Sequence, residues 1–373
     1  MEKLKYTRVE ECCEILDSMR IPITASDRKE GKYPYYGANG IQDYVNDYIF
    51  DDELVLLAED GGNFGSKEKP IAYRVSGKCW VNNHAHVLKP KEEIDVDYLC
   101  YSLMFYKVDG MINGATRKKL TQTAMKKMKI PLRNIVEQKK IVQQLNKIIE
   151  IREKAKKELN LLDNLIQARF VEMFGDPITN SKLLPIEKIE ERYFLKAGIT
   201  TKAEDIHDYL KDKYEIPCYG GNGIRGYVEN LSYEGCYPII GRQGALCGNV
   251  QYATGKFHAT EHAVLVSTLK NDNTMWVYYM LKLMDLYRYH TGAAQPGLAV
   301  KKLNTIDVIV ADINLQNQFA AFVHQINKSK FVIHKFLYCT THNTKSIIKP
   351  RLNTKESGKN KGRETTCRRI LTF

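Results

Sequence analysis

Short polar loops of this chain carry side chains that could read the edges of nucleic-acid bases. Arg and Gln can form bidentate hydrogen bonds with guanine and adenine, whereas Lys usually contacts phosphate. An ordinary solvated surface is the alternative for any single loop, but such loops recur at matching places in two repeats. We therefore predict DNA contacts at Arg117, Lys118, Lys119, Arg242, Gln243, Gln295, Lys301 and Lys302.

A run of twelve residues occurs twice, 183 residues apart. It reads PYYGANGIQDYV at residues 34–45 and PCYGGNGIRGYV at residues 217–228, with eight identical positions. The shared Tyr-Gly-x-Asn-Gly segment suits a turn with positive φ at Gly and Asn, which would place a loop and an aromatic ring at the surface. A plain hairpin turn is the alternative to a loop that faces DNA. The predicted contacts are Tyr36, Asn39, Asn222 and Arg225.

The second copy of this run also fits the dinucleotide-binding pattern GxGxxG, at residues 221–226. The first copy lacks two of the three glycines. Both copies continue into Tyr-Val, which indicates a strand where the motif requires a helix. We therefore predict that the chain itself holds no cofactor.

Histidines precede a strand-like segment in each copy. Residues 258–262 read HATEH, a zinc-peptidase pattern that requires a helix, and residues i and i+4 of a strand lie about 13 Å apart. Residues 82–86 read NNHAH, where no third ligand accompanies His84 and His86. We predict no metal site, and we interpret this segment as a polar strand edge or a groove contact at His84.

Composition narrows the class of protein. The 373 residues suffice for two or three domains, and +7 of the formal net charge of +12 falls after residue 338. No apolar run approaches the roughly eighteen residues of a membrane helix, and the nine cysteines form no CxxC pair. We expect a cytoplasmic protein with reduced thiols and no membrane partner. The chain has no Walker A, GxSxG or Asp/Asn-Pro-Pro-Tyr motif, so we expect motor and methyltransferase chemistry to lie in other proteins if this chain serves it.

Each copy changes from a strand-like to a helical pattern. Apolar runs at residues 55–57, 71–75, 237–240 and 263–266 indicate strands. The helical segments that follow have apolar residues at a 4-3 spacing, which is typical of a coiled coil. The predicted seam consists of Ile141, Leu145, Ile148, Leu159, Leu162 and Ile166 in the first helix and Phe319, Val323 and Ile326 in the second.

These patterns predict an α+β fold with two similar mixed α/β domains, separated by long antiparallel coiled-coil helices. Two such domains suit the reading of two spaced DNA sites, since equivalent faces of the duplex recur about every 34 Å. The expected boundaries are 1–134 for the first domain, 135–174 for the first helix, 175–313 for the second domain, 314–338 for a shortened second helix and 339–373 for a basic, disordered tail.

The sequence resembles the specificity subunits of type I restriction-modification systems. The resemblance covers residues 5–338 and rests on the order and duplication of several segments, not on one motif. The segments are residues 33–40, 80–88, 130–132, 137–138, 173–177, 241–245 and 315–319.

This resemblance implies two target recognition domains, each of which reads one half of a bipartite, asymmetric sequence in double-stranded DNA. It implies a non-catalytic subunit that binds two modification subunits and also restriction subunits. The partners would use S-adenosylmethionine for adenine-N6 methylation, and ATP with Mg²⁺ for cleavage. The helix seam would then serve subunit assembly.

Two alternatives stay open. The helical pattern fades near Tyr338, and the residues that follow resemble neither copy. This loss of pattern would fit a truncated or silent specificity cassette that folds without assembling an active complex. A self-contained nuclease or methyltransferase is disfavoured by the missing motifs.

Overall fold

The computed structural model describes residues 4–348, except residues 67, 115–116, 211–213 and 293–295, with side chains up to Thr340. The chain forms two compact units. The first contains the residues up to Lys154 together with the end of the last helix from Leu337, and the second contains Ala155–Phe336. In the part of the chain that is described, no helix is long and apolar enough to cross a membrane.

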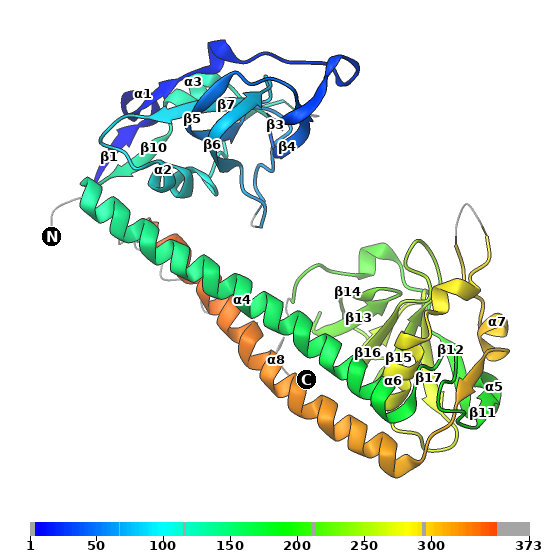
Figure 1. Ribbon diagram of the computed structural model, residues 1–373. Coiled ribbons are helices and arrows are strands. Elements are labelled where there is room, and N and C mark those ends of the chain that lie inside the picture. Colours follow the sequence, from blue (N-terminus) through cyan, green and yellow to red (C-terminus); the bar gives the residue numbers. More distant parts are fainter. Residues whose placement is uncertain (1–3, 67, 115–116, 211–213, 293–295, 349–373) are drawn as a thin grey trace. The chain divides into compact units, whose positions relative to one another are not determined.

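The first unit is built on a six-stranded mixed sheet (Figure 1). Only the pairing of β3 with β6 is parallel. The strand order across the sheet is β2 (Cys13–Ile15), β7 (Ala85–Pro90), β5 (Phe50–Ala58), β6 (Ala72–Val81), β3 (Glu30–Gly37) and β4 (Gly40–Val45).

Shorter elements complete this unit. Strand β1 pairs with β10, and β8 pairs with β9. Their bounds are Lys5–Arg8 for β1, Lys129–Leu132 for β10, Ile112–Asn113 for β8, Lys119–Leu120 for β9, Val9–Cys12 for α1, Val96–Leu103 for α2, Gln122–Lys126 for α3, Asp17–Met19 for η1 and Ala25–Asp27 for η2.

The second unit repeats this arrangement with the same strand order and again one parallel pair, β13 with β16. The order is β12 (Tyr193–Ala197), β17 (Ala263–Thr268), β15 (Tyr233–Gly241), β16 (Val250–Ala259), β13 (Ile216–Gly220) and β14 (Gly223–Val228). The remaining elements are β11 (Ile186–Lys188), β18 (Asp307–Ile309), α5 (Ile189–Arg192), α6 (Thr274–Leu283), α7 (Val300–Asn304), η3 (Ala203–Asp205) and η4 (Leu286–Tyr289). The predicted fold class of two similar mixed domains with long helices is therefore confirmed.

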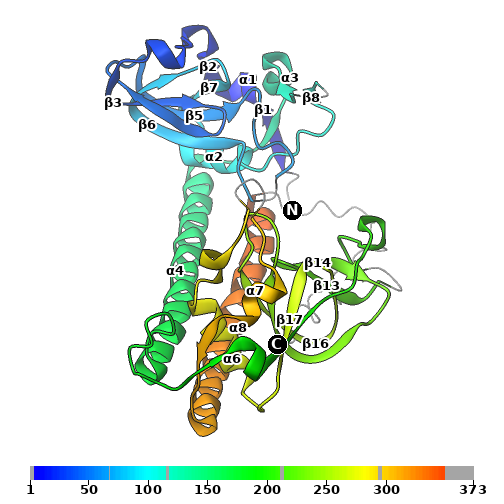
Figure 2. The same cartoon turned by 90° about the vertical axis from the view of Figure 1, so that its right-hand side faces the viewer.

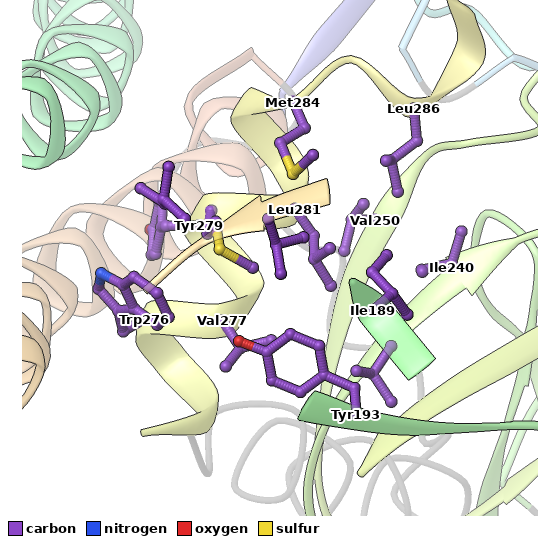
Figure 3. Close-up of a cluster of buried hydrophobic side chains, with 14 of the residues drawn as sticks. Ile189, Tyr193, Ile240, Val250, Trp276, Val277, Tyr279, Leu281, Met284 and Leu286 are labelled. Carbon is purple, nitrogen blue, oxygen red and sulfur yellow. The ribbon is translucent and has the colours of Figure 1, made fainter. Parts of the chain in front are cut away.

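The central strand of each sheet is buried on both faces, because its side chains alternate between two cores. Val55 and Leu57 of β5 belong to one hydrophobic cluster, and Leu54 and Leu56 belong to another. In the second unit, Ile240 and Ile239 of β15 divide in the same way. Figure 3 shows the cluster beneath α6, where Trp276, Val277 and Leu281 gather with Ile189 and Tyr193.

The repeated Asn-Gly segment forms a hairpin in both units, between β3 and β4 and between β13 and β14. Gly40 has φ of +111° and Gly223 has φ of +99°, a region that favours glycine. Neither Asn39 nor Asn222 has positive φ. The expectation of positive φ at the asparagines was therefore wrong, because the following glycine alone reverses the backbone.

Helix α4 covers Ile135–Phe174. Asn134 caps its N-terminus, because the Asn134 Oδ1 atom accepts a hydrogen bond from Glu137 N at 2.9 Å. It ends at Gly175, which takes a φ of +79° and donates its N–H to Val171 O at 2.8 Å.

In the second unit the end of α4 packs antiparallel against α8 (Figure 1 and Figure 2). The Phe319 ring lies 5.3 Å from Phe170 and 5.9 Å from Phe174, centroid to centroid, and Lys330 Nζ lies 2.6 Å from Asp163 Oδ1.

Most of the predicted seam faces inward. The seam residues Ile166, Phe319, Val323 and Leu145 are buried. The others are half-buried: Ile141, Ile148, Leu159, Leu162 and Ile326. Phe170 was missing from the prediction and is fully buried beside Phe319.

The second helix is longer than expected. Helix α8 spans Ile313–Ile348, ten residues beyond the predicted end at 338. Residues 339–346 have no apolar spacing in the sequence, so the pattern ends before the helix does. Within the predicted span, half-buried Ile333 and Leu337 continue the apolar spacing across Lys330. Lys330 can occupy an inward position because its ammonium pairs with Asp163. Of the predicted tail, residues 349–373 lie outside the described residues.

Candidate nucleic-acid interface

The two units share a loop framework after their central strands. The backbone hydrogen bonds around Glu59 and Gly61 in the first unit have counterparts around Arg242 and Gly244 in the second. The pairs are Glu59 N to His84 O (2.9 Å) with Arg242 N to His262 O (3.1 Å), Leu120 N to Glu59 O (2.7 Å) with Leu298 N to Arg242 O (2.8 Å), and Gly61 N to Lys118 O (3.3 Å) with Gly244 N to Pro296 O (3.0 Å). The chemistry at equivalent positions differs, because Glu59 and Asp60 stand where the second unit has Arg242 and Gln243.

In the first unit this framework gathers several predicted contacts around Asp60. The Asp60 Oδ1 atom lies 2.7 Å from His84 Nδ1 and accepts a hydrogen bond from Arg117 Nη2 at 2.8 Å. Asn39 Nδ2 donates to Gly61 O at 3.0 Å. Asn39, His84 and Arg117 therefore come from distant segments to one place.

The neighbouring carboxylate, Glu59, holds two more cations. It lies 2.6 Å from Arg20 Nη1 and 3.0 Å from the predicted contact Lys119 Nζ. Burial by itself raises the pKa of Glu59, but the hydrogen bonds from Arg20 and Lys119 outweigh burial and hold the pKa below its usual value. Glu59 is therefore a carboxylate at neutral pH.

A buried polar network lies beneath this loop. His86 is fully buried, with Nδ1 2.7 Å from Asp17 Oδ2 and Nε2 2.9 Å from Leu120 O. Burial opposes ionisation of Asp17, but hydrogen bonds from His86 and Gln122 leave its pKa lowered. The network therefore ties Leu120, next to Lys119, to the core.

The same network corrects one reading of the sequence. Near His86, for which no third ligand was evident, ligand atoms of Asp17 and Glu59 lie within 4.8 Å of its ring and of one another. This is the spacing of a metal site. Arg20 contacts both carboxylates, and Lys119 contacts Glu59. These cations already balance the negative charge, so the trio forms a self-contained ion-pair network.

In the second unit the position equivalent to Glu59 is occupied by Arg242, and one hydrogen-bond donor of its guanidinium has no partner among the described residues. The Nε atom of Arg242 is buried and has no hydrogen-bond partner among the described residues. Gln243 is exposed and forms a β-bridge with Gly297. Asn222 accepts a hydrogen bond from Asn249 Nδ2 at 2.5 Å. Arg242 and Gln243 therefore lie in a loop held by backbone hydrogen bonds equivalent to those around Glu59 and Asp60.

A close backbone contact shapes this part of the second unit. A Cβ atom on Gly241 would lie 2.2 Å from Gly221 O, so only glycine fits where the hairpin meets the end of β15. The hairpin turn and the loop with Arg242 are thus neighbours.

Other predicted contacts lie elsewhere. Tyr36 is half-buried in the sheet with its ring 5.7 Å from that of Tyr73, and burial raises its pKa. Arg225 and Lys118 are exposed, on β14 and in the loop before β9. Lys301 is exposed on α7, while Lys302 lines a hollow with Pro177, Ile178 and Asp307. Gln295 lies outside the described residues.

The histidines of the HATEH segment contact neighbouring side chains in and beside the sheet. His258 on β16 lies 2.8 Å from Thr201 Oγ1 and also contacts Ser232 Oγ. Burial lowers the pKa of His258, although Glu261 opposes this, so the ring is neutral at pH 7. His262 lies beyond the strand, 3.2 Å from Glu261. The two histidines have different partners.

Sequence reasoning missed Arg20, Glu59 and Asp60. Arg20 lies in no motif, and its contact with Glu59 spans 39 residues. Glu59-Asp60-Gly61 follows a strand as Arg242-Gln243-Gly244 does. Alignment of the two strand ends could therefore have found the acidic pair.

Comparison with known proteins gives matches over most of the chain. A family model described as "Type I restriction modification DNA specificity domain" matches residues 1–161 and 195–338. The chain is 46% identical over 133 residues to the type I restriction enzyme EcoprrI specificity subunit of Escherichia coli, covering 36% of this chain and 33% of that protein. It is 35% identical over 144 residues to the putative subunit S.HindORF215P of Haemophilus influenzae, covering 39% and 37%. The matched stretches thus span about a third of each relative.

Two solved structures share the fold. The S subunit of a type I restriction-modification system from M. genitalium superposes with a TM-score of 0.58 at 16% identity, covering 94% of this chain and 98% of that one. A chain from a study of complex assembly and conformational transition of the type I R-M system gives a TM-score of 0.54 at 12% identity, covering 94% and 100%. At these identities the likeness establishes the fold alone.

Proposed function

Because this chain belongs to the type I restriction-modification DNA specificity family, we propose that its two domains recognise the two halves of a bipartite, asymmetric DNA sequence. The observation that carries this proposal is the repeated loop framework with unlike side chains. A shared backbone can meet the same feature of the duplex twice, while Glu59-Asp60 and Arg242-Gln243 present different donors and acceptors.

The long helices would set the number of unread base pairs between the halves. Helix α4 has 40 residues and is therefore about 60 Å long. Buried aromatic packing against α8 in the second unit supports a rigid rather than flexible connection there.

Catalysis would belong to partner subunits. In this proposal the chain binds two modification subunits, which methylate adenine at N6 with S-adenosylmethionine. Restriction subunits would add ATP- and Mg²⁺-dependent cleavage. The chain itself would contribute sequence recognition and no catalytic group.

The alternative of a truncated or silent cassette loses its main support. It rested on the early fading of the second helical pattern, whereas α8 continues to Ile348.

Methylome mapping tests the proposed function directly. The chain would be expressed with the modification subunit in a host without other DNA methylation, and N6-methyladenine would be mapped by single-molecule sequencing. We expect one bipartite motif with a fixed internal gap. Absence of methylation, while the same modification subunit is active beside another intact specificity subunit, would contradict the proposal.

A further inference from the structure

We propose that Asp60 is a positioning residue that determines base preference in the first domain, because it orients the guanidinium of Arg117 toward one base. In the second domain the corresponding strand end would itself supply the reading group, through Arg242. This inference rests on the proposed function and assigns sequence selectivity to particular residues within it.

The geometry around Asp60 supports an orienting role. The Asp60 side chain is only 17% exposed, whereas the Arg117 side chain is 61% exposed, and their contact is 2.8 Å. The guanidinium lies over Gly61, since a Cβ atom there would be at ordinary contact distance, 3.6 Å, from both Arg117 Nε and Nη2. His84 lies against the same Asp60 oxygen. A largely buried carboxylate thus holds one edge of an exposed arginine.

Orientation matters because guanine recognition by arginine is directional. The guanidinium has five N–H donors in a rigid plane, and guanine offers O6 and N7 as a pair of acceptors. When Asp60 binds Nη2, one donor is occupied and the directions in which the remaining donors of Arg117 can face are restricted. Without the carboxylate the same cation would still attract phosphate but would sample many orientations.

The second domain has different side chains at the equivalent positions. Arg242 and Gln243 replace Glu59 and Asp60 on the equivalent backbone, so a cation stands where the first domain has an acid. Removal of Asp60's charge should therefore change one half of the recognised sequence and leave the other half as it was.

The test is a selection from a random duplex DNA library with the full chain, followed by sequencing of the bound pool. The variants are Asp60→Asn, which keeps the shape but removes the charge, and Arg117→Lys, which keeps the charge but removes the fork. Asp97→Asn is the matched control, because Asp97 pairs with Arg74 at 3.2 Å in the same domain and has no polar contact with the described part of the loop. Thermal unfolding of each variant verifies that it is folded.

We expect the wild-type chain to select a bipartite motif. In Asp60→Asn and Arg117→Lys, the preference at one position of one half should fall about 5- to 150-fold, with the other half and the control unchanged. An unchanged motif in Asp60→Asn, or an equal loss on all sequences, would overturn the positioning role while the proposed function stands. If even the wild-type chain selects no motif, both the proposed function and this inference are overturned.

Discussion

Two buried glutamines join the long helices to their domains. Gln138 at the start of α4 and Gln316 at the start of α8 are both fully buried. Gln138 accepts from Asp95 N and donates to Glu93 O and Arg133 O, all at 2.8 Å. In the second domain, Gln316 accepts from Asn273 N at 2.8 Å and donates to Asp272 Oδ1 and Ala311 O.

Removal of the buried Gln138 side chain should therefore lower the stability of the first domain. We expect Gln138→Ala to lower the free energy of unfolding of the first domain by about 1–3 kcal/mol or more, since it leaves buried backbone groups without partners. Urea unfolding measures the change. The matched control is Gln144→Ala, on an exposed position of α4; equal stability losses in both variants would contradict the anchoring role.

Binding to specific and to random DNA distinguishes an arginine that contacts a base from one that contacts a phosphate. Arg242→Ala should weaken binding to the specific site by about 1–3 kcal/mol if the arginine reads a base. Fluorescence titration with the selected duplex and with random duplex measures the difference. An equal loss on random DNA would instead assign Arg242 to a phosphate.

The acidic pair of the network predicts acid sensitivity. Glu59 and Asp17 have lowered pKa values in the folded chain, so their contribution to stability is present above the unfolded pKa of about 4 and is lost as pH falls through the folded values. We expect the unfolding temperature of the first domain to drop below about pH 4. Glu59→Gln should flatten this dependence; a steeper one would contradict the assignment.

At the scale of elements, the helix pair is fastened by aromatic rings rather than by charges. Phe319 is fully buried against Phe170, Phe174 and Tyr279. The Lys330–Asp163 pair leaves its carboxylate side chain 44% exposed. Such exposed pairs contribute at most about 1 kcal/mol.

Phe319→Ala should consequently destabilise the second unit by about 3–5 kcal/mol through loss of buried area and the resulting cavity. Chemical denaturation followed by circular dichroism would measure it. Phe336→Ala serves as the control, because Phe336 is 39% exposed on the same helix and should have little effect. Comparable losses in both variants would refute the assigned packing.

For the molecule as a whole, much of the positive charge lies in the C-terminal segment, outside the two domains proposed to read the DNA sequence. Residues 349–373 carry a net charge of +6, half of the formal total of +12. Cationic segments raise the affinity for any duplex by releasing counterions from phosphate, without reading sequence.

Deletion of residues 349–373 should therefore weaken binding to random duplex and reduce its salt dependence, while the selected motif stays the same. Titrations between about 50 and 200 mM salt would show the changed slope. A changed motif after the deletion would place recognition outside the two domains.

Features that depend on residues close together in the chain could be predicted from the sequence. The repeated Asn-Gly hairpin, the apolar strand runs and the 4-3 helical spacing are local patterns, so they revealed the duplication and the fold class. The same locality explains the error at α8, because residues 339–346 carry no apolar spacing although the helix continues to Ile348.

Which side chains meet in the loops could be seen only in the folded chain. Asp17 and His86 are 69 residues apart, and Asp60 and Arg117 are 57 apart, yet they form hydrogen bonds of 2.7 and 2.8 Å. No periodicity links such residues, because strand order in the sheet, not distance along the chain, brings them together. The equivalence of Glu59-Asp60 with Arg242-Gln243 became visible only when the same backbone hydrogen bonds were found around both.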